Sequence, residues 1–279
     1  MSLLDVILNC VALLLWLNWR SIDLSPTIRA GSGSLLSTLK RIEVRQEKTW
    51  VYLAGLILLL LVRPIFYQRL GDAYQWVPVL DLGVVRFSFR VQELGKVYLY
   101  STLAFLKIAG VFYWCVIFLA AVHRKLPDTV TYQRFVRLHL GPLVRLPSWL
   151  LIFGVPLSVL CLWAGLQTPM AALGLVPEIR PSAQVWRQGG ALALSVYLAW
   201  AMPLAWVFGL HLVNSYVYLG NHDFWNYVNA TARRVLEPVR FIPLAIARVD
   251  LAPVLALVAC GMMDHFGTEA LLRLYSSKF

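Results

Sequence analysis

Two ionisable residues fall inside apolar stretches and are the first candidates for chemistry. Lys107 lies near the centre of the apolar run 97–122, and Asp264 lies in the outer half of the run 250–272. A charge at the centre of a bilayer costs at least about 2.5 kcal/mol, so it normally has a partner or water. In antiparallel helices the two side chains would lie at similar depth, which predicts an ion pair or an ion pathway. The alternative is that Lys107 extends to the headgroups while Asp264 ends a short last helix.

Histidines suggest a second kind of chemistry, the ligation of a cofactor. A b-type haem within a membrane needs two histidines at matching depth on different helices. His123 ends the run 97–122 and His211 lies within the run 189–219, both toward the predicted inner side. They are therefore the candidate ligands for a haem or a pigment. The simpler interpretation is that His211 bonds a neighbouring helix, and no cofactor is our first expectation.

The sequence contains none of the common soluble-enzyme motifs. There is no GxxxxGK[ST], no GxGxxG after a strand, no HExxH and no GxSxG. Each cysteine stands alone in apolar sequence, which is typical of a small apolar side chain and not of a metal ligand or a disulfide. These cysteines are Cys10, Cys115, Cys161 and Cys260. We therefore expect a non-enzymatic protein without a metal site.

Composition places the chain among integral membrane proteins. Of its 279 residues 59% are hydrophobic and 14% are charged, and the mean hydropathy is +0.68. Soluble domains of this length are much more polar. The net charge of +11 would suggest nucleic acid in a soluble protein. In a membrane protein it more often reflects loops beside anionic lipid, so we expect lipid and not nucleic acid as the partner.

Six apolar runs are candidates for membrane spans, because a helix needs roughly 20 mostly apolar residues to cross a bilayer. They are 3–19, 50–68, 97–122, 148–167, 189–219 and 250–272. The first run is short and the fifth is long enough to tilt or to project from the bilayer. The predicted fold class is an all-α polytopic membrane protein with about six spans.

The distribution of basic residues predicts the orientation of these spans. The segments 20–49, 123–147 and 220–249 together carry fifteen Lys or Arg residues, and the alternate segments carry nine. Cytoplasmic loops carry the excess of positive charge. The first set is therefore predicted inside and both termini outside.

Three extramembrane segments have a recognisable pattern. Residues 34–50 and 223–236 have the pattern of basic amphipathic helices, which lie flat at a headgroup boundary or pack on neighbouring loops. Residues 73–91 alternate Val84, Arg86, Ser88 and Arg90 with Val85, Phe87, Phe89 and Val91. This alternation predicts a strand or hairpin outside the membrane that offers an edge to another chain.

An internal repeat is predicted in the second half of the chain. The segment from Thr131 aligns with the segment from Asp223, so that Tyr132, Phe135 and Val136 meet Phe224, Tyr227 and Val228. In both copies a long span leads into an aromatic amphipathic helix, a Pro-x4-Pro turn and a returning span. The predicted division is an N-terminal extension 1–96, a first hairpin repeat 97–167, a linker 168–188 and a second repeat 189–279.

Prolines and an aspartate mark the turn before the last span. Pro238 and Pro243 are expected to bend the connection, because each lacks an N–H and disfavours helix in the residue before it. Pro253 suits the first turn of the last helix, and Asp250 is placed to cap that helix at the positive end of its dipole. The alternative role for Asp250 is binding a cation or a partner.

This stretch resembles the signature of the YggT (YlmG) family of integral membrane proteins, in which a Thr-Glu-Pro and basic-Pro stretch leads into Leu-Asp-Leu-Ser-Pro-Ile. The residues that match are Glu237, Pro238, Arg240, Pro243, Asp250 and Pro253. Leu236 stands where the family usually has Thr, and Ala247-Arg248 where it has Gly-Gly. The resemblance covers the second repeat well and the first weakly, and it does not extend to 1–96.

The resemblance implies a fold of two hairpins of two spans and a non-enzymatic role. Members of the family look linked to osmotic or potassium tolerance and cell division in bacteria, and to haem attachment to a cytochrome b6 in chloroplasts. We expect a structural or assembly subunit that docks to other integral membrane proteins, in a bacterial cytoplasmic membrane. The alternatives are a small ion transporter or channel component, which would require Lys107 and Asp264, and a subunit that carries haem or pigment through His211.

Overall fold

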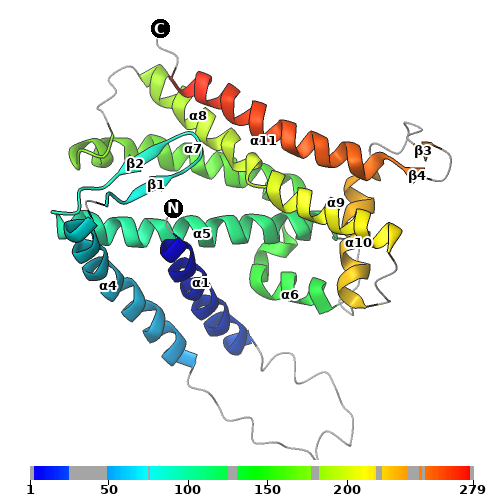
Figure 1. The fold of residues 1–279 in the computed structure, drawn as a ribbon, viewed down its shortest axis with the longest axis horizontal. Helices are drawn as coiled ribbons and strands as arrows, with labels where there is room; N and C mark the ends of the chain where they lie inside the picture. Colours follow the sequence, from blue (N-terminus) through cyan, green and yellow to red (C-terminus); the bar gives the residue numbers. More distant parts are fainter. Residues whose placement is uncertain are drawn as a thin grey trace, which may run out of the picture. The chain divides into compact units, whose positions relative to one another are not determined.

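The computed structural model describes most of the chain and is almost entirely helical (Figure 1). The described residues are 3–24, 49–74, 76–124, 131–176, 182–217, 222–237, 245–246 and 249–276. Within them, six helical stretches are long and apolar enough to cross a membrane. The predicted all-α membrane fold is confirmed. The predicted amphipathic helix at 34–50 lies almost wholly outside the described residues.

Long helices form the spans, and short elements connect them. The long helices are α1 (Leu3–Leu24), α4 (Thr49–Tyr74), α5 (Leu94–Val122), α7 (Ser148–Ala172), α8 (Ser182–Leu198), α9 (Ala201–Tyr216) and α11 (Ala252–Ser276). The short ones are α6 (Thr131–Leu140), the 3-10 helix η1 (Gly141–Arg145) and α10 (Asp223–Val235). The strands are β1 (Val79–Asp81), β2 (Arg86–Ser88), β3 (Ala245–Ile246) and β4 (Val249–Asp250).

The chain forms two compact units. Unit 1 comprises Met1–Leu80 and Phe87–Gly110, and unit 2 comprises Asp81–Arg86 and Val111–Phe279. In unit 1 small residues let the helices approach closely, because Ala12 and Ala109 are buried in one cluster with Leu56 and Phe105. In unit 2, α7 packs against α8, and α11 packs against both α8 and α9.

The fifth span is broken, and this differs from the continuous run predicted over 189–219. Helix α8 ends at Leu198 and α9 begins at Ala201. Pro203 explains the break, because it has no N–H for the carbonyl of Ala199 and its ring crowds that carbonyl. The turn is filled by a stacked pair of rings, Trp114 of α5 and Trp200, whose centroids are 4.3 Å apart.

Carbonyls that lose their helical partner at a proline are bonded by side chains from other helices. Pro156 of α7 cannot donate to the carbonyl of Ile152, and the hydroxyl of Tyr197 on α8 donates to that oxygen over 3.0 Å. In unit 1, Pro64 leaves the carbonyl of Leu60, which accepts from the hydroxyl of Ser101 at 3.4 Å. A bilayer supplies no water for such groups, so these bonds join the helices.

Hydrogen bonds from tryptophan side chains also link the break in the fifth span to α5. The carbonyl of Val196 lies one turn before α9, and Trp114 Nε1 donates to it over 2.8 Å. Trp200 Nε1 in turn donates to the carbonyl of Trp114 over 3.3 Å. The backbone irregularity is therefore compensated by a helix distant in sequence.

The predicted hairpin at 73–91 is confirmed as β1 and β2. Phe87, Phe89 and Val91 are buried, whereas the intervening Arg86, Ser88 and Arg90 are exposed. Val84 is also buried, which differs from the predicted alternation, because it lies in the turn before β2 begins. The turn itself uses Gly83 at a φ of +86°, a conformation that other residues rarely adopt.

The proline-containing turn after α6 is also as predicted. Gly141 has a φ of +54° and opens η1, where Pro142 follows it. Pro147 then stands in extended conformation immediately before α7. The corresponding Pro238 and Pro243 lie outside the described residues.

We predict that Tyr197→Phe lowers the free energy of unfolding by about 1–3 kcal/mol, because it leaves the carbonyl of Ile152 buried without a donor. In a Pro156→Ala background the same change should cost much less, since the alanine introduced there supplies the helical N–H. Thermal unfolding in detergent of the four proteins in this cycle measures the coupling. Tyr216→Phe, at a tyrosine that is 61% exposed, is the control. Equal losses in both backgrounds would contradict the assigned role of the tyrosine hydroxyl.

Candidate functional site

A buried group of polar and charged side chains joins the three helices of unit 1. The side chains come from α1 (Asp5 and Asn9), α4 (Arg63 and Tyr67) and the first half of α5 (Tyr100). None of the five is more than 2% exposed. Ionisable residues within membrane spans are expensive to bury and are retained where they have a structural or functional role.

Within this cluster the charged side chains of Asp5 and Arg63 pair with each other and also have hydrogen-bond partners. Arg63 pairs with Asp5, donates from Nη1 to Asn9 Oδ1 over 2.8 Å, and donates from Nε to the Tyr67 hydroxyl over 2.5 Å. The hydroxyls of Tyr67 and Tyr100 donate to the two carboxylate oxygens of Asp5 over 2.5 and 3.0 Å. Asp5 thus accepts from Arg63 and from both tyrosines, and it ties α1 to both α4 and α5.

Sequence reasoning missed this cluster, although a signal was present. Asp5 and Asn9 are four residues apart, and so are Arg63 and Tyr67. That spacing places each pair on one face of its helix. Two apolar spans that each carry a polar pair at this spacing, one acidic and one basic, would have indicated the contact.

A second buried junction, in unit 2, joins the end of α5 to α10. His123 follows α5 directly and its side chain is fully buried. Its Nε2 lies 2.6 Å from Thr231 Oγ1 on α10, and its ring lies 4.5 Å from the ring of Tyr227. Arg234 Nη1 donates to the carbonyl of Val122 over 3.0 Å, where the end of the α5 dipole favours a positive charge.

The hydrogen bonds fix the tautomer of His123. The hydroxyl of Thr231 donates to the carbonyl of Tyr227 over 2.8 Å, so it must accept a hydrogen from His123 Nε2. The Nδ1 atom is then unprotonated and faces Arg234 Nη1 at 3.4 Å. Burial, and then the charge of Arg234, lowers the pKa of His123 from 6.5 to about 4. The neutral ring is therefore the form that holds α10.

Helix α10 also contacts α6 and α9. The ring of Tyr132 on α6 lies 5.4 Å from Tyr227 and 6.1 Å from Phe224. His211 on α9 is 2.7 Å from Asn229 Oδ1 through its Nδ1. His211 therefore bonds a neighbouring helix, as the simpler interpretation of this residue expected.

The residues predicted to hold a cofactor or to line an ion path are all described by the structure. Both ring nitrogens of His123 face protein side chains, and so does Nδ1 of His211. Lys107 is half-buried on α5 in unit 1, and Asp264 is exposed on α11 in unit 2. Their pairing stays a prediction. Across the described ranges, no three His, Cys, Asp or Glu residues gather as a metal site would require.

The residues that match the family signature are only partly described. Pro253 is buried in the first turn of α11, as predicted, and Glu237 is exposed just after α10. Strand β4, which includes Asp250, pairs antiparallel with β3. Pro238, Arg240, Pro243 and the side chain of Asp250 lie outside the described residues, so the predicted cap is not tested.

We predict that Arg63→Met lowers the free energy of unfolding by about 3–5 kcal/mol, because it leaves the carboxylate of Asp5 buried without its cation. Asp5→Asn combined with Arg63→Met should restore much of this loss, since a neutral amide needs no cation: its oxygen can accept from one tyrosine hydroxyl and its NH2 can donate to the other. Thermal unfolding in detergent gives the comparison, with Arg86→Met as the exposed control. If the double variant is no more stable than Arg63→Met alone, the ion pair is not the source of the effect.

We predict that thermal stability falls as the pH is lowered from about 6.5 toward 4. The pKa of His123 is lowered in the folded protein, so the unfolded chain takes up the proton first and stability is lost across this window, by up to about 3 kcal/mol. His123→Gln should flatten the pH dependence, whereas His265→Gln, at an exposed histidine, should leave it unchanged. An identical pH profile in the wild type and His123→Gln would refute the assignment.

No protein-family model matches this chain, and neither a curated protein nor a solved structure matches it. The resemblance to the YggT family remains a prediction from the residues quoted above. The geometry of the two junctions, and the surfaces that they hold in place, are therefore the basis for a proposed function.

Proposed function

We propose that this protein is a non-enzymatic integral membrane subunit that docks to a larger membrane complex and supports its assembly. The observation that carries the proposal is the difference between the two faces of α10. Its inner face is fixed by buried contacts, while its outer face is exposed. A surface that is ordered before binding loses little conformational freedom when a partner binds.

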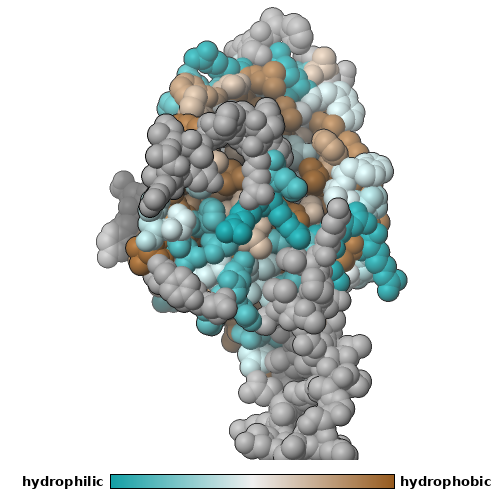
Figure 2. All heavy atoms as spheres, turned by 90° about the vertical axis from the view of Figure 1, so that its right-hand side faces the viewer, coloured by the Kyte–Doolittle hydropathy of each residue, from teal (hydrophilic) through white to brown (hydrophobic). Residues whose placement is uncertain are grey.

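The two faces of α10 differ clearly. Tyr227, Val228, Thr231 and Ala232 are buried against the rest of unit 2. Asn226 and Arg233 are exposed on the other side of the helix, whereas Phe224, also exposed, lies on the same side as the buried residues. Figure 2 views the side on which α10 lies in Figure 1, and hydrophilic and hydrophobic residues appear side by side there. Arginine is among the residues that most often anchor protein interfaces.

Charge supports a partner of opposite sign at this end of unit 2. Arg124, Arg145 and Arg233 are exposed on the segments that enter or leave α6 and α10. The positive-inside prediction places these segments on the cytoplasmic side. An acidic segment of a neighbouring membrane protein, or anionic lipid around it, fits this surface.

The experiment is to purify the native protein in a mild detergent and identify the proteins that co-elute. We expect a stoichiometric set of other integral membrane proteins. Arg233→Glu should reduce their recovery severalfold, because it reverses a charge at the rim of the contact. Arg86→Glu, on the hairpin, is the matched control and should have no effect. A homo-oligomer that runs alone would contradict the proposal.

A second candidate function, ion transport, is favoured by the buried Asp5–Arg63 pair. Paired charges within spans also mark ion and proton pathways. Ion flux into liposomes that contain the purified protein, abolished by Lys107→Met, would support transport over docking. An absorption spectrum of the same preparation tests the cofactor alternative. A visible band that His211→Ala removes would indicate bound haem or pigment.

A further inference from the structure

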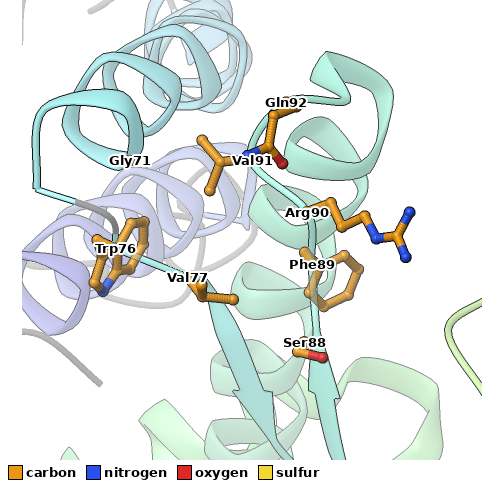
Figure 3. Close-up of a pocket in the computed structure, with 8 residues that line it drawn as sticks. All are labelled: Gly71, Trp76, Val77, Ser88, Phe89, Arg90, Val91 and Gln92. Atoms are coloured by element: carbon orange, nitrogen blue, oxygen red, sulfur yellow. The ribbon is translucent and has the colours of Figure 1, made fainter.

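A cavity of about 360 Å³ lies within unit 1, where α4 ends and the hairpin leads into α5 (Figure 3). The N–H of Phe89 donates to the carbonyl of Pro78 over 2.9 Å, which closes the base of the hairpin. Beyond this bond, the segment that enters the hairpin and the segment that leaves it diverge (Figure 3). Trp76 and Val77 lie on the first, and Arg90 and Val91 lie on the second. The cavity occupies the space between them.

The floor of this cavity is firmly built. A Cβ atom on Gly71 would overlap with the side chain of Val91, so the absence of a side chain lets α4 press against the segment. The ring of Trp76 lies 5.1 Å from that of Tyr67, and the ring of Phe89 lies 5.4 Å from that of Tyr100. These are the tyrosines that donate to Asp5, so the buried ion pair supports the cavity wall.

The lining has an apolar side and a polar side. Trp76 and Val77 offer an aromatic ring and an aliphatic surface that is 52% exposed at Val77. Ser88, Arg90 and Gln92 offer a hydroxyl, a guanidinium and an amide, and all three are exposed. The Arg90 side chain extends away from Trp76 (Figure 3). The matching ligand carries an apolar part and, at its other end, a hydrogen-bond acceptor.

Charge pairing indicates that this acceptor is an anion. Arg86 binds Asp81 over 3.0 Å, and Lys96 binds Glu93 over 2.9 Å. Arg90 lies between them and has no carboxylate partner among the residues that the structure describes. Among the residues that the structure describes, the cavity lining contains no acidic side chain. A cation that has no carboxylate partner in the described part of the chain, beside an amide and a hydroxyl, is suited to binding a phosphate.

The position of the cavity along the chain indicates a lipid. Gly71 is the last residue of the second apolar stretch and Leu94 is the first of the third. Both spans therefore end beside the cavity, which places it at the level of the headgroups. We propose that the cavity binds an anionic phospholipid at the level of its headgroup. The lipid phosphate lies at Arg90 and Gln92, and the apolar part of the lipid lies against Trp76 and Val77. This site is independent of the docking role of α10.

Native mass spectrometry of the full chain in detergent, titrated with phosphatidylglycerol or phosphatidylcholine, tests the proposal. We expect one phosphatidylglycerol to bind more tightly than the rest, and more tightly than phosphatidylcholine. Arg90→Gln should weaken this binding by about tenfold or more, as expected for a lost hydrogen bond to a charged group. Arg86→Gln is the matched control and should bind like the wild type. Equal loss in both variants would show general attraction to basic residues and would overturn the site.

A second pair of variants tests the cavity without changing charge. Val77→Trp fills the cavity and should abolish the tight binding of the lipid. Val79→Trp is the control and should not, because Val79 is 39% exposed and does not line the cavity. Each variant is accepted only if it elutes as a single species and unfolds at the wild-type temperature. Retention of the tight lipid by Val77→Trp would contradict the proposal. Displacement of the lipid by millimolar inorganic phosphate would assign the site to free phosphate instead.

Discussion

The interior of a bilayer contains no water, so every backbone carbonyl in a span needs a donor from the protein. This constraint explains the positions of several side chains that sequence patterns leave unexplained. Proline interrupts the helical bonds of α4 and α7, and the freed carbonyls of Leu60 and Ile152 accept from Ser101 and Tyr197. A residue that would otherwise weaken one helix thus fixes the position of another.

The same constraint applies to charge. Asp5 and Arg63 are tolerated because each finds partners within unit 1, and the result is a link between α1, α4 and α5. The aromatic rings that surround this pair continue outward to Trp76 and Phe89, which form the wall of the proposed lipid site. In unit 2, the neutral imidazole of His123 has a comparable role, because it joins α10 to the end of α5. The exposed surfaces proposed for lipid and for a protein partner are each held in place by one of these buried junctions.

Local sequence patterns predicted most of the elements. Apolar length predicted the six spans, alternation predicted the hairpin around Gly83, and the position of Pro253 predicted the start of α11. The pairing of Asp5 with Arg63 was not predicted, because the two residues lie on different spans and only the folded protein brings them together. The break between α8 and α9 was missed for another reason. Pro203 was visible in the sequence, but the run around it is apolar enough to suggest an unbroken helix. The signature from Glu237 to Asp250 lies largely outside the described residues, so its role is still inferred from resemblance.

In the predicted membrane topology the hairpin and α10 lie on opposite sides of the bilayer, since three spans separate them along the chain. Cysteine labelling tests this most directly, in a chain whose four native cysteines have been replaced by alanine. Single cysteines are introduced at Ser88 and at Asn226, both exposed. In intact cells an impermeant thiol reagent should label the cysteine at position 88, and should reach position 226 only after the membrane is opened. Labelling of both positions from the same side would contradict the six-span arrangement.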